Sequence, residues 1–332
     1  MLATREDSDL SARTISWYTI SMISRTLRSV VLAVILPGAV FPALAAGPPT
    51  PAQEAPADAR IREIEAWRTA REGRLRSENG WLTLVGLAWL QPGENPFGSA
   101  AKNAVVLPEG SAPAVAGSFV LDGGKVRLVA AAEAGVTVGG QPASNQVVRS
   151  DADGEPDDIR VGRLRLTLIR RGDRLGIRVK DPESPVRTGF RGIESFPTNL
   201  AWRIEGTFVP YDPPHELEIP TVLGTVEKMQ APGLVRFASA GREFTLEPVL
   251  ENPGDQQLFF IFRDATSGKE TYEAGRFLYT DLPKDGRVTV DFNQAYNPPC
   301  AFTHFATCPL PPKKNWLPIR VEAGEKKYGA HP

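Results

Sequence analysis

The most reactive side chains of this 332-residue chain lie in one segment, YNPPCAFTHFATCPLPP, which spans residues 296–312 and contains Cys300, His304 and Cys308. Such residues can form a metal site, a reactive thiol pair or a disulfide. A structural zinc ion needs four nitrogen or sulfur ligands, and this segment supplies three at a non-standard spacing. Reactive pairs more often have the spacing Cys-x-x-Cys beside a helix N-terminus. We therefore expect neither a metal nor another cofactor.

The redox state of the cysteines depends on the compartment, which the start of the chain indicates. Arg25 and Arg28 precede an apolar run of about 16 residues, and a small-residue motif that ends at Ala45 follows, a layout typical of a secretory signal peptide. We predict a signal peptide over residues 1–45, with Met22 as an alternative start. A retained anchor is the alternative, but the run is shorter than the roughly 20 residues of a spanning helix. We expect a periplasmic or secreted protein with no stable membrane span after signal removal.

Export makes a disulfide the expected state of a chain with two cysteines. The bond between Cys300 and Cys308 would close a loop of about nine residues, so its stabilisation should lie at the low end of the usual range of about 2 to 4 kcal/mol. We therefore expect it to hold a proline-rich loop in place and to contribute little to the stability of the whole domain.

A second group of reactive side chains falls on two predicted strands. On KETYEAGRFLYT, Glu270, Tyr272 and Arg276 share one face, and on RVTVDFN, Asp291 and Asn293 belong to the polar face. If these strands pair across the short turn between them, the charged groups meet on one side of the sheet. An enzyme could then use a carboxylate as general base and the arginine to stabilise developing negative charge. The alternative is a solvated face, where cross-strand pairs contribute about 0.2 to 1 kcal/mol each.

Arginines and tyrosines are also common where a site recognises anionic or sugar-like groups. The candidate ligand-binding residues are Arg203, Tyr211, Tyr272, Asn293, Tyr296 and Asn297. No Gly-x-Ser-x-Gly nucleophile motif occurs in the sequence. Two function classes remain open. The first is a binding or structural module for an unknown envelope or small-molecule ligand, and the second is a hydrolase or transferase that uses Glu270 or Asp291 with Arg276 on a small polar substrate.

A mainly β fold must position these residues. The 30 glycines and 30 prolines are spread along the chain, which suits short strands joined by tight turns. We predict a disordered proline-rich leader over residues 46–57 and a short helix from Asp58 to about Arg76. Residues 58–180 should form this helix and an antiparallel β-sandwich, and residues 181–332 a second antiparallel β domain, a sandwich or barrel, with the cysteine-bearing loop. A net charge of −1 without a basic stripe argues against nucleic-acid binding.

Individual strands can be predicted from alternation. In RLRLTLIRR, Leu164, Leu166 and Leu168 fall on one face, as in a half-buried antiparallel strand. The run LFFIFRD is apolar on both faces until Arg263, which predicts a strand covered on both sides. Between the first strand and the next, LQPGENPFGS is interpreted as a glycine-rich turn.

The order of the first strands resembles a β-sandwich of the forkhead-associated type. Members that bind phosphothreonine have an arginine after the first glycine turn and a serine and histidine further on. Here the sequence at that turn is Phe97-Gly98-Ser99, and no histidine occurs before His215. The resemblance therefore implies a sandwich and no phosphopeptide binding.

A second resemblance covers most of the chain, from about Trp67 to Tyr328. The stretch GKETYEAGRFLYTDLPKDGRVTVDFNQAYNPPCAFTHFATCPLPP, together with IPTVLGT, FRGIESFP and WRIEGTFVPYDPP, resembles the bacterial domain-of-unknown-function family numbered 1684. Its most distinctive elements are Asn297 to Cys300 and Cys308 to Pro312. The resemblance implies a shared fold and no established activity.

Overall fold

The computed structural model describes residues 56–329, which belong to one compact unit. The predicted signal peptide and the leader up to residue 55 lie outside the described residues. Within them the chain is mainly β, with several antiparallel sheets and one long helix at its start, which confirms the predicted fold class.

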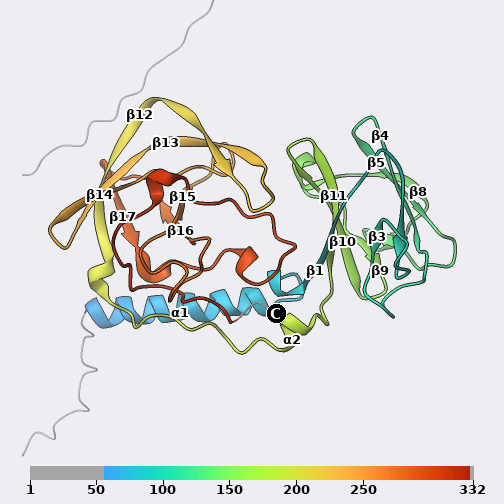
Figure 1. Ribbon diagram of the computed structural model, residues 1–332, viewed down its shortest axis with the longest axis horizontal. Helices are drawn as coiled ribbons and strands as arrows, with labels where there is room; N and C mark the ends of the chain where they lie inside the picture. Colours follow the sequence, from blue (N-terminus) through green and yellow to red (C-terminus); the bar gives the residue numbers. More distant parts are fainter. Residues whose placement is uncertain (1–55, 330–332) are drawn as a thin grey trace, which may run out of the picture. The chain divides into compact units, whose positions relative to one another are not determined.

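The long helix α1 (Pro56–Arg76) begins two residues before the predicted start at Asp58, so the last two residues assigned to the leader are helical. Asp58 lies in its first turn, where a negative charge interacts favourably with the helix dipole. Figure 1 shows α1 running alongside the C-terminal strands. Two ion pairs hold it there: Arg60 to Asp291 at 2.6 Å and Arg71 to Glu325 at 3.2 Å.

Residues 84–180 form a sandwich of two sheets with strand orders β1-β11-β10-β9-β6-β7 and β3-β2-β4-β5-β8. Leu164, Leu166 and Leu168 of β10 are buried in the core between the sheets, as predicted, and Phe97 and Phe119 contact the same core from the other sheet. The strands are β1 (Leu84–Trp89), β2 (Gly93–Gly98), β3 (Val105–Val106), β4 (Gly117–Asp122), β5 (Lys125–Ala130), β6 (Thr137–Val138), β7 (Gln141–Pro142), β8 (Asn145–Val148), β9 (Ile159–Val161), β10 (Leu164–Arg171) and β11 (Arg174–Lys180).

Strand β2 corrects the interpretation of LQPGENPFGS as a turn, because GENPFG pairs along its length with β4. Asn95 explains why a segment rich in glycine and proline can form a buried strand. Its side-chain amide donates to the carbonyl oxygens of Gln91, Gly93 and Phe119, at 2.8, 3.0 and 3.1 Å. These bonds supply the pairing that a proline-containing strand cannot make through its own backbone.

The C-terminal region contains a four-stranded sheet, β14-β13-β12-β17, and a two-stranded sheet, β15-β16. Strand β15 is buried on both faces, as predicted: Leu258 and Phe260 contact the core shared with the four-stranded sheet, whereas Phe259 and Ile261 contact a second core beside the cysteines. The strands are β12 (Arg203–Pro220), β13 (Val226–Ser239), β14 (Arg242–Leu246), β15 (Gln257–Phe262), β16 (Arg276–Asp281) and β17 (Arg287–Asp291).

The predicted hairpin between the last two strands is wrong. Strand β16 pairs with β15, and β17 pairs with β12, so the turn at Asp285-Gly286 connects two different sheets. The other edge of β16 is occupied by Tyr296, which exchanges backbone hydrogen bonds with Phe277. Residues 269–275 also precede β16, and Glu270 and Tyr272 therefore lie in a loop instead of on a strand.

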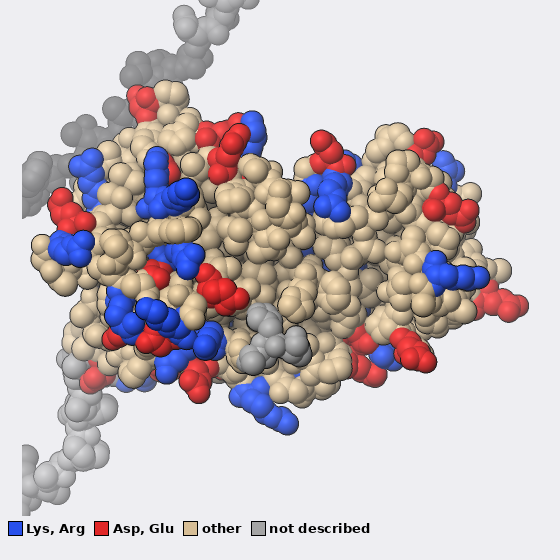
Figure 2. Space-filling view, viewed as in Figure 1, with Lys and Arg blue, Asp and Glu red and all other residues tan. Residues whose placement is uncertain are grey.

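Short helical turns complete the fold: α2 (Pro185–Thr188) and the 3₁₀ turns η1 (Trp81–Thr83), η2 (Asp151–Asp153), η3 (Leu200–Trp202), η4 (Phe292–Gln294), η5 (Pro299–Ala301) and η6 (Lys313–Asn315). No helix among residues 56–329 has the length and apolar character needed to span a membrane. On the face drawn in Figure 2, basic and acidic side chains are interspersed.

Candidate functional site: an aromatic cleft

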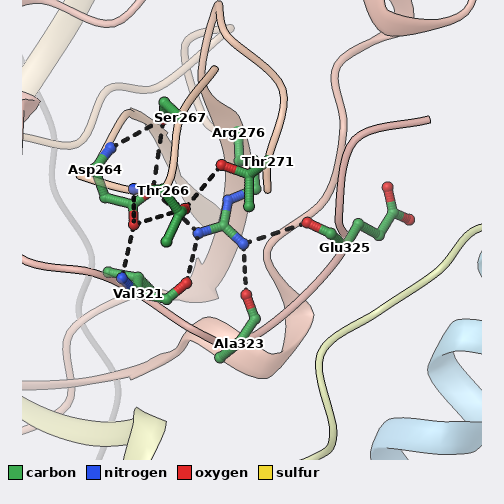
Figure 3. A network of polar contacts seen from close by, with 8 residues as sticks. All are labelled: Asp264, Thr266, Ser267, Thr271, Arg276, Val321, Ala323 and Glu325. Atoms are coloured by element: carbon green, nitrogen blue, oxygen red, sulfur yellow. Dashed lines mark hydrogen bonds and ion pairs between the residues drawn. The ribbon is translucent and has the colours of Figure 1, made fainter. Parts of the chain in front are cut away.

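Arg276, a predicted catalytic residue, is buried in a polar network (Figure 3) and is only 1% exposed. Its Nη1 donates to the carbonyl oxygens of Ala323 and Glu325, and its Nη2 donates to the Val321 carbonyl at 3.0 Å and to Asp264 at 3.3 Å. Burial lowers the pKa of the guanidinium, and Asp264 opposes that effect. The network joins the loop before β16 to the C-terminal segment, so Arg276 has a structural role.

The buried Asp264 connects this loop to the C-terminal segment. Its carboxylate accepts hydrogen bonds from the hydroxyl of Thr266 at 2.9 Å and from the Val321 N–H at 2.7 Å. Thr266 and Thr271 share a further hydrogen bond between their hydroxyls at 2.9 Å (Figure 3). The two charged side chains of the network thus compensate each other, and only the Nε of Arg276 is without a hydrogen-bond partner among the described residues.

The two predicted catalytic carboxylates lie apart from Arg276 and from each other. Glu270 is on the surface and pairs with Arg320 at 2.5 Å, which holds the pKa of Glu270 below its usual range. Asp291 is buried and pairs with Arg60 of α1. The enzyme hypothesis needs these groups in one concavity, and the structure does not bring them together.

Three predicted binding residues also have structural partners. The exposed Arg203 lies 3.9 Å from Asp291. Asn293 is fully buried and bonds the backbone of Asn199 through both its amide atoms, at 2.9 Å each. The Asn297 N–H donates to the carboxylate of Glu325 at 2.7 Å.

Tyr211 belongs to a separate cluster around the buried Glu247. Its hydroxyl donates to the Glu247 carboxylate at 2.7 Å, and burial raises the pKa of Tyr211 to about 12. His215 and Lys314 lie 3.5 and 3.3 Å from the same carboxylate. All three groups contact Oε1 of this carboxylate, whereas its Oε2 is buried without a hydrogen-bond partner among the described residues.

The cysteines lie side by side and are both buried, and the structure has them as free thiols. The Cys300 N–H donates to the Cys308 sulfur at 3.2 Å, and the Tyr272 hydroxyl donates to the Cys300 carbonyl at 3.0 Å. The disulfide stays a prediction. Among residues 56–329, no group of three or more His, Cys, Asp or Glu side chains is placed to hold a metal ion.

A cleft of about 1200 Å³ is the strongest candidate for a site. Helix α1, η1, the β10–β11 turn, the start of β13, strands β15 and β16 and the cysteine-bearing loop all contribute to its lining. Six aromatic side chains face it: Trp67, Trp81, Phe259, Phe277, Tyr279 and Tyr296. Only Tyr296 was predicted from the sequence as a binding residue.

The centre of the cleft wall is an ordered stack of rings. Tyr279 lies between Phe259 and Tyr296, with ring centroids 4.8 and 6.3 Å away and interplanar angles of 19° and 15°. The Arg71 guanidinium carbon lies 4.6 Å from the centroid of the Tyr296 ring. Arg71 is itself fixed by Glu325 and by the carbonyl of Asn297, at 3.2 and 2.9 Å. The rings of this wall are therefore fixed by their neighbours before any ligand binds.

Two carboxylates and several amides accompany the rings. Glu227 is half-buried, and burial raises its pKa, with Glu251 adding to the rise and Arg171 opposing it. Glu251 accepts a hydrogen bond from the Tyr279 hydroxyl. Burial raises the pKa of Glu251, and this hydrogen bond opposes the rise. Burial also raises the pKa of Tyr279. The cleft therefore combines apolar faces with groups that hold protons more tightly than usual.

Sequence reasoning selected the wrong face of β16. Parity correctly separates Arg276 from Phe277 and Tyr279, but Arg276 points to the closed core and the two aromatic residues point to the cleft. The sequence did contain a signal for the cleft, because Phe277 and Tyr279 are two aromatic residues on the strand face opposite Arg276. The contributions of Trp67 and Glu227 depend on contacts between distant segments, which no local pattern reveals.

Comparison with known proteins identifies a protein family, but that family has no known activity. The model of the family "Protein of unknown function (DUF1684)" matches residues 188–326. A solution structure of an uncharacterised protein from Haloarcula marismortui is 30% identical, over 44% of this chain and 80% of that one, with a TM-score of 0.36.

Two further matches are forkhead-associated domains. One comes from a study of phosphothreonine-dependent interactions and is 20% identical over 30% of this chain and 96% of that one; the other is the FhaA domain in a complex, 19% identical over 28% and 97%. Both have a TM-score of 0.21. No curated protein matches. On the match of the family model, residues 188–326 belong to the DUF1684 family of proteins of unknown function.

Proposed function

We propose that this chain is an exported β-rich binding protein whose cleft takes a small, hydroxyl-rich ring compound of the cell envelope, such as a glycan fragment. The observation that supports this most strongly is the cleft of about 1200 Å³ with its stacked aromatic wall. Pockets that bind small molecules are mostly apolar clefts of about 300 to 1000 Å³ with a few polar groups that set orientation. This cleft is somewhat larger than that range and has both kinds of lining.

The polar lining suits hydroxyl groups. A carboxyl group with a raised pKa keeps its proton up to a higher pH than usual, and in the protonated form it can donate as well as accept a hydrogen bond. Glu227 and Glu251 have this property, and the amides of Asn252, Gln257 and Gln294 also offer both donors and acceptors. Sugar rings present hydroxyls at their edges and apolar C–H faces, which would contact the aromatic rings.

A binding measurement with tryptophan variants tests this proposal. Calorimetric titration of the mature protein with a panel of neutral and acidic sugars should give saturable binding. Trp67→Ala should weaken binding about tenfold, because a buried aromatic contact contributes about 1 kcal/mol or more. The matched control is Trp316→Ala, since Trp316 is exposed and lies outside the cleft. Equal loss in both variants, or no binding by the wild type, contradicts the proposal.

A second candidate is acid–base hydrolysis in the same cleft. The observation in its favour is the interaction between Glu227 and Glu251, because two coupled carboxylates with raised pKa values can divide the roles of acid and base. Slow breakdown of a bound oligosaccharide that stops in Glu227→Gln, with binding retained, would favour this candidate over simple binding.

Export and the disulfide belong to the same proposal. Their support is the signal-like layout of residues 22–45 and the adjacency of Cys300 and Cys308. Protein recovered from the periplasm or medium should begin near Ala46 and contain no free thiol. Mass spectrometry after alkylation measures both, and two alkylated cysteines in native exported protein would contradict the disulfide.

A further inference from the structure

Arg178, in the middle of β11, is a buried arginine without a protein counterion. It is 9% exposed, and among residues 56–329 its Nε and Nη2 have no hydrogen-bond partner. Its neighbours across the sheet are Leu87 and Thr167, neither of which carries a charge. Buried arginines are almost always paired, because an uncompensated buried charge is costly.

The surroundings of Arg178 add positive charge. Burial and then the Arg171 cation lower the pKa of Arg178 to about 10. Burial and then Arg178 lower the pKa of the nearby Lys180 to about 8. The acid that acts on Arg178 is Asp151, and it already pairs with Arg171 at 2.8 Å. The excess charge at this place is therefore positive.

Strand alternation places these cations on one face of the sheet, next to the cleft residue Trp81, although neither cation is itself among the lining residues. Leu175, Ile177 and Val179 of β11 are buried in the sandwich core, so Arg178 and Lys180 are on the outer face of that sheet. The Arg178 guanidinium carbon lies 5.0 Å from the centroid of the Trp81 ring, which lines the cleft.

Two more cleft residues adjoin Arg178. Its electrostatic neighbours include Arg171 and Cys308, both in the cleft lining, and Arg171 donates to Thr307 of the cysteine-bearing loop at 3.2 Å. The ring contact with Trp81 stabilises the cation through the negative face of the ring. This contact does not supply a hydrogen-bond acceptor for Nε and Nη2 of Arg178, so both nitrogens still require one.

We propose that Arg178 is an anion-binding residue at the edge of the aromatic cleft, and that the ligand of the cleft carries a carboxylate or phosphate whose oxygens bond its guanidinium. The planar fork of arginine donors matches both groups. Lys180 supplies further positive charge beside the same Trp81 ring, whereas Arg171 already pairs with Asp151 and lies 4.0 Å from Glu227. This inference rests on the proposed function and narrows its ligand class to acidic or phosphorylated ring compounds.

Three ring compounds of matched size test the proposal: glucose, glucuronic acid and glucose 6-phosphate, titrated against the full mature protein. The wild type should bind one or both acidic compounds about tenfold or more tightly than glucose, because charge-assisted hydrogen bonds are strong. In Arg178→Gln that preference should disappear while glucose binding is unchanged. The carboxylate and phosphate compounds distinguish the two anion classes.

Arg174→Gln is the matched control. Arg174 is an exposed arginine of the same strand, and its guanidinium carbon lies 4.1 Å from the ring centroid of Trp89, which does not line the cleft, whereas the buried Arg178 contacts the cleft residue Trp81. This variant should keep the preference for acidic compounds. An unchanged preference in Arg178→Gln, or an equal loss in both variants, overturns the anion site.

A thermal measurement separates this proposal from the proposed function. Inorganic phosphate should raise the Tm of the wild type above its value in sodium chloride at equal ionic strength, and should not do so for Arg178→Gln. If phosphate acts in this way and no sugar binds, the anion site stands and the glycan proposal fails. If sugars bind without regard to charge, the glycan proposal stands and the anion site fails. Absence of any anion effect contradicts the anion site.

Discussion

Arg276 and Arg178 are both buried arginines on β-strands, and the Nε of each has no hydrogen-bond partner among the described residues. They differ in the partners of their terminal nitrogens. Arg276 is 1% exposed and donates to one carboxylate and three backbone carbonyls (Figure 3). Arg178 is 9% exposed, and no acceptor among the described residues bonds its Nε or Nη2. The Arg276 guanidinium joins two segments of the chain, whereas the Arg178 guanidinium lies next to a cleft with N–H groups that have no acceptor among the described residues. A buried charge therefore suggests function where its partners are missing and structure where they are present.

The largest predicted effect is the loss of the Arg276 network. Arg276→Ala should lower the free energy of unfolding by about 3 to 5 kcal/mol, because Asp264 would remain as an unpaired buried charge. Urea denaturation followed by circular dichroism measures this change. An effect no larger than that of a surface substitution would mean that the network does not hold the loop before β16.

Arg178→Met should have the opposite sign. The substitution keeps much of the side-chain volume and removes an unpaired buried cation, so the free energy of unfolding should rise by about 1 to 3 kcal/mol in buffer without multivalent anions. The same denaturation experiment measures it. A destabilised Arg178→Met would show that the guanidinium has a structural partner, and the contrast with Arg276 would then fail.

Much of the fold could be predicted from the sequence, because apolar alternation depends on neighbours along the chain. Leu164, Leu166 and Leu168 were assigned to the correct face in this way. Strand pairing was predicted less well. The turn at Asp285-Gly286 resembles a hairpin turn in sequence, but it connects β16 and β17, which belong to different sheets.

The site was harder to predict than the fold. The charged residues most prominent in the sequence, such as Arg276, serve a closed network. The alternating IRVK of β11 has the pattern of a solvated strand face, and the burial of Arg178 becomes visible only when the cysteine-bearing loop and η1 lie over that face.

Lys180 gives a smaller, pH-dependent effect. Burial holds its pKa near 8, below the ordinary value of 10.5, so between these pH values the unfolded chain binds more protons than the folded one. Stability should therefore rise with pH across this window, and below pH 8 the full cost of the buried charge is present. The expected gain is on the order of 1 kcal/mol, since nearby water reduces the full effect of the shift.

Comparison with Lys180→Met checks the assignment. This variant should be more stable than the wild type at pH 7 and should lack the rise between pH 8 and pH 10.5, as seen in thermal denaturation at closely spaced pH values. Glu227 and Glu251 have raised pKa values and therefore make stability fall as pH rises through the acidic range, so they do not interfere with this window. A rise of equal size in Lys180→Met would assign the titration to another group.

The smallest effect is expected at Glu270, the carboxylate first considered as a partner of Arg276. Glu270 pairs with Arg320 on the surface, where water and salt screen the attraction, so Glu270→Gln should leave the denaturation midpoint unchanged within error. In a double-mutant cycle with Arg276→Ala the two changes should be additive, because the side chains share no partner. Coupling between them would place Glu270 inside the Arg276 network and revive the hypothesis of a site on that side of β16.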